Sequence, residues 1–95
     1  MENKLLPQEL ALYKAIDEVL WRDWDPIGIS GIEGARDEYQ MYLPQVYQLA
    51  LAGDHAKIVN YLFAVAVERM ALKTQRTQHV AAADKILAAK AQVGL

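Results

Sequence analysis

Apolar residues recur at every third or fourth position in four separate stretches of this 95-residue chain, and no stretch alternates apolar and polar residues like a strand. This spacing predicts helices over residues 7–21, 35–52 and 54–70, and a last helix from Thr74 or Thr77 to about Gln92. Each apolar face must be buried against another element, and a chain of this length can build one core. We therefore expect a single all-α domain over residues 1–95, a compact four-helix domain with short connections after the second helix.

Residues at the expected helix ends agree with these limits. Pro7 fits the first turn of a helix, where its missing N–H leaves no bond unmade. Gly53 fits the end of the second helix, and Asp54 fits the N-cap of the third. Pro44 falls inside the second expected helix, where it removes one backbone hydrogen bond. That helix must bend at Pro44 or begin anew there, and we expect the bend.

The stretch from Asp23 to Glu33 combines helix-breaking and apolar residues. Pro26 favours extended geometry at Asp25, and Gly28, Gly31 and Gly34 follow at every third position. Apolar side chains lie between them, namely Trp24, Ile27, Ile29 and Ile32. We expect a long Gly/Pro loop that packs on the core between the first and second helices. Trp24 also continues the expected apolar stripe of the first helix, which runs through Leu10, Tyr13, Ile16 and Leu20.

Charge is divided unevenly along the chain, although the net charge is only −2. Residues 1–54 hold ten acids and four bases, a balance of −6, whereas residues 55–95 hold two acids and six bases, a balance of +4. The two halves can attract each other within one fold, or the acidic half can form a surface that meets a basic partner. Nucleic acid is not expected as a partner at this net charge.

The chain has no cysteine, which excludes disulfides, thiolate metal sites, iron–sulfur clusters and cysteine nucleophiles. A small domain without cysteine needs no oxidising compartment, so we expect the protein to be cytoplasmic. The first ten residues contain no apolar run typical of a signal peptide, and no stretch of about 18 uncharged apolar residues predicts a membrane span. No cofactor is expected.

Catalytic motifs are incomplete in this sequence. Ser30 lies in a G-I-S-G segment whose second glycine comes one place too early for a nucleophile elbow, and no strand precedes it. The two histidines, His55 and His79, are far apart, and we expect each to face solvent near a helix start. A calcium loop beginning at Asp23 would lack oxygen ligands at its fifth and twelfth positions. The sequence therefore predicts neither an enzyme nor a metal site.

Acidic residues gather in the expected loop and at the start of the second helix, close in sequence to four large aromatic residues. The acids are Asp23, Asp25, Glu33, Asp37 and Glu38, and the aromatic residues are Trp21, Trp24, Tyr39 and Tyr42. Such acids can simply cap a turn or stabilise a first helical turn, and the tyrosines can belong to the core. Alternatively, aromatic side chains supply binding energy at an interface where charges set specificity. The partner-binding residues that we predict are Asp23, Trp24, Asp25, Asp37, Glu38 and Tyr39, with Trp24 as loop anchor or hot spot.

Three short motifs carry a resemblance to other proteins. They are W-x-x-W-D-P-I-G from Trp21 to Gly28, D-E-Y-x-x-Y-x-P from Asp37 to Pro44, and Y-x-L from Tyr47 to Leu49. Together with Gly53 they resemble a group of small, largely uncharacterised bacterial helical proteins, over most of the chain from Trp21 onward. The resemblance implies an immunity-like or antitoxin-like protein that binds a bacterial toxin. Residues 29–35 depart from the pattern because they are apolar and carry extra glycines, so no site residue is carried over.

These observations favour a non-enzymatic protein-binding module, an immunity-like inhibitor whose acidic, aromatic-rich surface meets a basic protein such as a nuclease toxin. Neither nucleic acid nor a membrane is expected as a partner. One alternative is a carboxylate-based metal hydrolase, which requires Asp25, Asp37 and Glu68 to converge. Another alternative is a structural homo-oligomer joined by the alanine-rich last helix.

Overall fold

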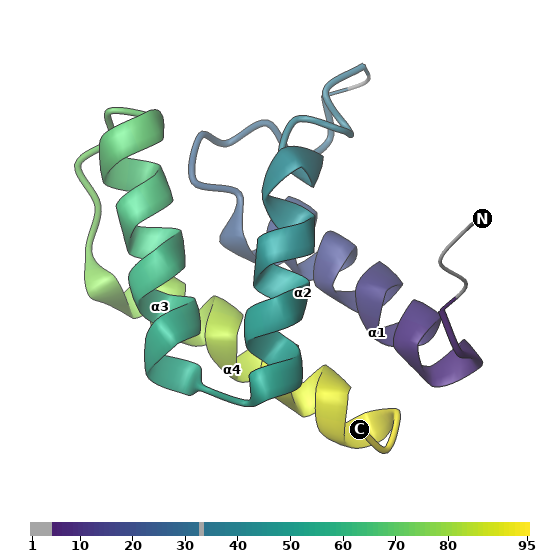
Figure 1. Ribbon diagram of the computed structural model, residues 1–95. Coiled ribbons are helices and arrows are strands. Elements are labelled where there is room, and N and C mark those ends of the chain that lie inside the picture. The colour runs from purple at the N-terminus through teal and green to yellow at the C-terminus, as the bar shows by residue number, and fades with distance from the viewer. Residues whose placement is uncertain (1–4, 33) are drawn as a thin grey trace.

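The computed structural model describes residues 5–32 and 34–95, which contain four α-helices and no strand (Figure 1). The helices are α1 (Pro7–Glu18), α2 (Leu43–Ala52), α3 (His55–Ala64) and α4 (Arg76–Gln92). Three shorter turns adjoin them: the π-helical turns η1 (Val19–Trp24) and η3 (Val65–Arg69), and the 3-10 turn η2 (Gln40–Tyr42). The expected all-α fold of four compactly packed helices is confirmed.

The helices pack around α4. α2 and α3 form a hairpin, α4 crosses behind both of them, and α1 lies on the other side of α2 (Figure 1). α4 contacts α1, α2, α3 and η1, and its inner face of His79, Ala82, Ala83 and Ile86 is fully buried. The small alanines let neighbouring helices approach closely at this face. Ala82 and Ala83 therefore pack inside their own domain and not on an outer surface of α4.

The turn between α2 and α3 follows the sequence expectation. Gly53 adopts the left-handed conformation with φ 71°, and its N–H donates to the carbonyl oxygens of Leu49 and Ala50. The Asp54 carboxylate then accepts a hydrogen bond of 3.1 Å from the Lys57 N–H and caps α3. The predicted helix end and the predicted N-cap are both confirmed.

The first helical segment is longer than expected, and it buries the expected stripe except for Leu10. The chain continues from α1 through η1 to Trp24, and the Asp25 N–H donates to the Leu20 carbonyl, five residues back. The fully buried residues of α1 are Leu12 and Ile16, whereas Leu10 is exposed. Leu10 lies two residues from Leu12 and therefore points to the opposite side of the helix. The inclusion of Leu10 in the apolar stripe was wrong.

The second helix begins anew near Pro44 and does not bend there, so that expectation was also wrong. Residues 36–39 form turns, η2 follows, and α2 starts at Leu43 with Pro44 in its first turn. A proline in a first turn sacrifices no hydrogen bond, which makes this arrangement cheaper than a bent helix. α4 begins at Arg76, between the two expected starts Thr74 and Thr77, and Gln75 is its N-cap residue.

The connection from Asp25 to Tyr39 packs on the core only in part. Tyr39 is buried and Ile29 is half-buried, but Ile27 and Ile32 are exposed by 41% and 53%. The expectation that both of these isoleucines pack on the core is therefore wrong. Asp25 also differs from its expected extended geometry, since it adopts φ 28° and ψ 61° where the π-helical turn ends.

Candidate functional site

Trp24 anchors the connection to the core. Its side chain is 2% exposed, and its indole N–H donates a 3.0 Å hydrogen bond to Nδ1 of His79 on α4. The indole also packs against Tyr39 and Tyr42, with ring centroids 5.4 and 6.3 Å apart. Tyr39 is as deeply buried as Trp24. Both rings are therefore enclosed by the domain, and Trp24 acts as the loop anchor, one of the two roles expected of it.

The Asp25 carboxylate holds the first part of the connection in shape. It accepts hydrogen bonds from the backbone N–H groups of Ile29 (2.8 Å) and Ser30 (3.0 Å). It also accepts a 2.7 Å bond from the Tyr39 hydroxyl, whose oxygen in turn accepts the Ile27 N–H at 3.2 Å. Burial and the bond to Asp25 raise the pKa of Tyr39 above its ordinary value. This network ties the two ends of the connection together.

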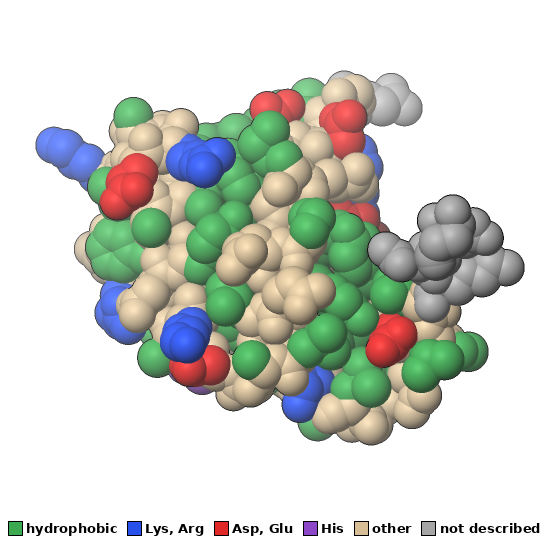
Figure 2. All heavy atoms as spheres, viewed as in Figure 1, with side chains coloured by type: hydrophobic (Ala, Val, Ile, Leu, Met, Phe, Trp, Pro, Cys, Tyr) green, Lys and Arg blue, Asp and Glu red, His purple; other side chains and the backbone are tan. Residues whose placement is uncertain are grey.

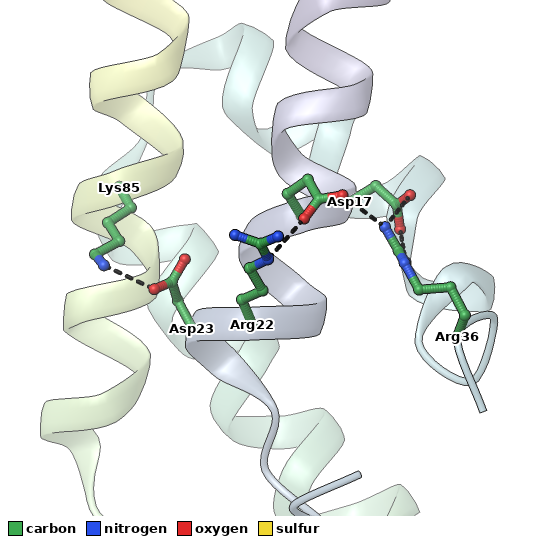
Figure 3. A network of polar contacts seen from close by, with 6 residues as sticks. Asp17, Arg22, Asp23, Arg36 and Lys85 are labelled. Carbon is green, nitrogen blue, oxygen red and sulfur yellow. Dashed lines mark hydrogen bonds and ion pairs between the residues drawn. The ribbon is translucent and has the colours of Figure 1, made fainter. Parts of the chain in front are cut away.

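A second polar network lies on the outside of α1 and η1 (Figure 3). The Arg36 guanidinium donates two 3.1 Å bonds to Asp17 and one of 3.0 Å to Glu18, and it lies over the Trp21 ring at 5.3 Å. The bonds to Asp17 raise the pKa of Arg36. Because these partners are partly exposed, the network orients residue 36 more than it adds stability.

Asp23 is engaged with the basic half of the chain. Its carboxylate lies 2.7 Å from the Lys85 ammonium on α4 (Figure 3). In residues 5–32 and 34–95 this is the one ion pair that joins the acidic half of the sequence to the basic half. Direct ion pairing between the two halves therefore explains little of the uneven distribution of charge along the sequence.

Two predicted acids remain exposed on the connection. Asp37 and Glu38 form no ion pair within the described residues, and both lie in the turn that leads to Tyr39. Large apolar side chains are exposed in the same part of the chain; Met41 in η2 is 70% exposed. We use the name loop surface for the exposed side chains that the connection and η2 carry: Ile27, Ile32, Asp37, Glu38 and Met41. Figure 2 shows apolar and acidic side chains together at the end of the molecule where this connection lies. Glu33 falls outside the described residues.

The metal hydrolase alternative finds no supporting arrangement. No group of three His, Asp or Glu side chains that could hold a metal ion occurs among the residues that the structure describes. Asp25 is occupied by loop hydrogen bonds, while Asp37 and Glu68 lie exposed on the connection and in η3. No pocket opens anywhere in the described part of the chain.

The two histidines have different environments, and sequence reasoning missed one of them. His55 is partly exposed, as a residue near a helix start commonly is, and its Nε2 atom lies 2.7 Å from the Asp84 carboxylate. His79 was expected to face solvent but is fully buried. Its place four residues before Ala83 and seven before Ile86 was a usable signal, because that spacing puts it on the buried stripe of α4.

Comparison with protein-family models, with curated proteins and with solved structures finds no match to this chain. Within the described residues, no helix has the length and apolar character needed to cross a membrane.

Proposed function

We propose that this chain is a non-enzymatic protein-binding module, and that its loop surface meets a basic protein. In this proposal the module is a bacterial, cytoplasmic inhibitor of the immunity or antitoxin kind, and the partner is a basic toxin. The motifs around the DPIG segment suggest this class of protein. The proposal assigns contact roles to Asp37 and Glu38, and it assigns scaffolding roles to Asp23, Trp24, Asp25 and Tyr39.

The observation that carries the proposal is a hydrogen-bonded loop that leaves large apolar side chains exposed to solvent. Four hydrogen bonds of Asp25 and Tyr39 fasten residues 25–30 to Tyr39, yet Ile32 and Met41 remain more than half exposed. A loop held in one shape loses little conformational entropy when a partner binds it. Exposed apolar side chains then gain by being covered, and neighbouring acids select a partner of opposite charge.

The charge of the loop surface favours a basic protein over a neutral one. Asp37 and Glu38 add two negative charges. Within the described residues, neither of them forms an ion pair with a basic side chain. Arg36, the nearest base in sequence, is turned toward Asp17 and Glu18 on α1. Carboxylates in this situation speed association with a cationic surface, and salt weakens that effect.

A titration with a defined candidate tests the proposal. If a gene beside this one encodes a basic, toxin-like protein, its product is the candidate, and isothermal calorimetry at two salt concentrations measures binding. We expect one-to-one binding that weakens as salt rises. Glu38→Gln should weaken binding about tenfold, the low end of the range of about 1.5–7 kcal/mol that close charge pairs at interfaces contribute.

Glu68→Gln is the matched control, since it makes the same chemical change at an exposed site in η3. It should leave the affinity unchanged. Equal losses from Glu38→Gln and Glu68→Gln would mean that only net charge matters, which contradicts a defined loop surface. Absence of heat with the neighbouring gene product, or absence of such a gene, would also count against the inhibitor proposal.

A further inference from the structure

The hydrogen bonds around His79 determine which of its nitrogens carries the proton. The Trp24 indole N–H can only donate, so the Nδ1 atom that it meets at 3.0 Å must be an unprotonated acceptor. In a neutral imidazole the other nitrogen, Nε2, then carries the hydrogen and donates it to the Thr74 hydroxyl at 3.0 Å. The Thr74 hydroxyl hydrogen points in turn to the Gln75 carbonyl at 3.4 Å. Every polar atom of His79 is satisfied only in this one neutral form.

A second proton on His79 cannot be accommodated in this arrangement. Protonated Nδ1 would be a donor that faces the Trp24 donor, and the charge would lie at a fully buried site. Among the residues that the structure describes, no carboxylate faces the ring; its neighbours are Trp24 from η1, Phe63 stacked at 5.3 Å from α3, and Thr74 from the α3–α4 connection. Arg76, on α4 itself, is the charged group whose field reaches the ring, and its charge repels an imidazolium.

Burial, and secondarily the charge of Arg76, lower the pKa of His79 below its ordinary value of 6.5. The consequence for stability has a definite sign. Above pH 6.5 the histidine is neutral in both the folded and unfolded chain, and its full contribution is present. As the pH falls below 6.5 the unfolded chain takes up the proton first, so stability declines.

Trp24 links His79 to the loop surface. The indole that bonds to His79 packs directly on Tyr39, and the residue after Trp24 is Asp25, whose carboxylate holds Ile29 and Ser30. A change at His79 therefore reaches the connection through Trp24. The α2–α3 hairpin is fastened by separate contacts at Gly53 and Asp54.

We propose that the Trp24–His79 pair is an acid-sensitive latch, in which proton uptake by His79 breaks the indole hydrogen bond and frees the connection 25–39 from the core. The α2–α3 hairpin keeps its structure during this opening. The latch follows from the buried hydrogen bonds alone and does not depend on the loop surface having a partner.

Nuclear magnetic resonance of the His55→Asn variant tests the latch, because His79 is then the only histidine. Nitrogen chemical shifts should show unprotonated Nδ1 at pH 7.5. Between pH 7.5 and 5, hydrogen exchange of the Trp24 indole and of the Ile29 amide, corrected for intrinsic rates, should rise at least tenfold. This rise should follow the His79 imidazole titration, while amides of α3 such as Leu62 stay protected.

His79→Asn separates the latch from general acid sensitivity. The asparagine side-chain oxygen can take the place of Nδ1 as an acceptor but cannot gain a proton in this range. The corrected exchange of the Trp24 indole should then become independent of pH. An acid dependence that persists in His79→Asn, or simultaneous opening of the loop and of α3 in the His55→Asn variant, would overturn the proposal.

Trp24→Phe provides the deciding measurement if His79→Asn does not fold. This change removes the opposing N–H and keeps an aromatic ring. His79 should then accept a proton more readily, and its imidazole midpoint should rise by at least half a pH unit. An unchanged midpoint would show that the indole N–H does not oppose protonation, and the latch would be rejected.

Discussion

The connections 25–39 and 70–75 begin alike and are stabilised differently. Each follows a π-helical turn, η1 or η3, and each then places a residue other than glycine at positive φ: Asp25 at 28° and Ala71 at 55°. Such a backbone costs an L-residue about 1–2 kcal/mol. In the first connection the residue that bears this strain also forms three hydrogen bonds through its side chain, whereas in the second it has no polar side chain at all.

This difference shows two ways of reversing a chain after a π-helical turn. The Asp25 carboxylate accepts hydrogen bonds from the N–H groups of Ile29 and Ser30, which follow the turn, so its strain is offset where it arises. At Ala71 the left-handed backbone lets the Leu72 N–H return to the Ala66 carbonyl at 3.0 Å, a role that helices usually give to glycine. The first arrangement requires the carboxylate of Asp25, whereas the second uses no side-chain group of residue 71.

The largest expected effect comes from removing the side chain that anchors the first connection to α4. Trp24→Ala deletes a buried indole and leaves Nδ1 of His79 without its donor. We expect a loss of about 3–5 kcal/mol in the free energy of unfolding, measured by urea denaturation. Trp21→Ala, at a half-buried ring, is the control and should cost less than half as much. Equal losses would mean that Trp24 is not the special anchor of the connection.

The next effect separates strain from hydrogen bonding at Asp25. Asp25→Gly relieves the positive φ but removes the acceptor of the Tyr39 hydroxyl and of the Ile29 and Ser30 amides. Lost hydrogen bonds should outweigh relieved strain, and we expect a net loss of about 2 kcal/mol by urea denaturation. Asp37→Gly, in an exposed turn of the same connection, should cost markedly less. A stabilised Asp25→Gly variant would show that strain dominates here.

The smallest effect has the opposite sign. Ala71→Gly relieves a similar backbone strain and removes no hydrogen bond, while glycine gains entropy in the unfolded chain. We expect a net stabilisation of about 0.5–1 kcal/mol, seen as a rise of a few degrees in the melting temperature. Ala81→Gly, at an exposed site inside α4, is the control and should destabilise by a similar amount. A loss of stability in both variants would contradict the comparison of the two connections.

Much of the fold could be predicted because its signals are local. Apolar spacing predicted the four helices, and Gly53 with Asp54 marked one turn correctly. The start of α2 was missed because both a bent helix and a new helix satisfy the pattern around Pro44. Only the cheaper backbone hydrogen bonding of a proline in a first turn distinguishes them.

The candidate site was only partly within reach of sequence reasoning. The acids of the connection could be located, but the roles of Asp25 and of Glu38 could not be separated. A carboxylate becomes part of the scaffold when N–H and O–H groups fold back to it, and here one of those groups comes from Tyr39, fourteen residues away. His79 was assigned to solvent because its polarity outweighed its position on the buried stripe of α4.

The sequence by itself determined the elements that depend on neighbours a few residues apart: helices set by apolar spacing, a glycine that ends α2 and an aspartate that caps α3. Only the tertiary structure decided where η1 and η3 widen into π-helical turns, which acids point inward, and that Trp24 meets His79 across 55 residues. The physical reason is that these features are settled by burial and by hydrogen-bond partners from distant segments. Most buried donors in folded proteins have an acceptor, and the acceptor closest in space need not be close in sequence.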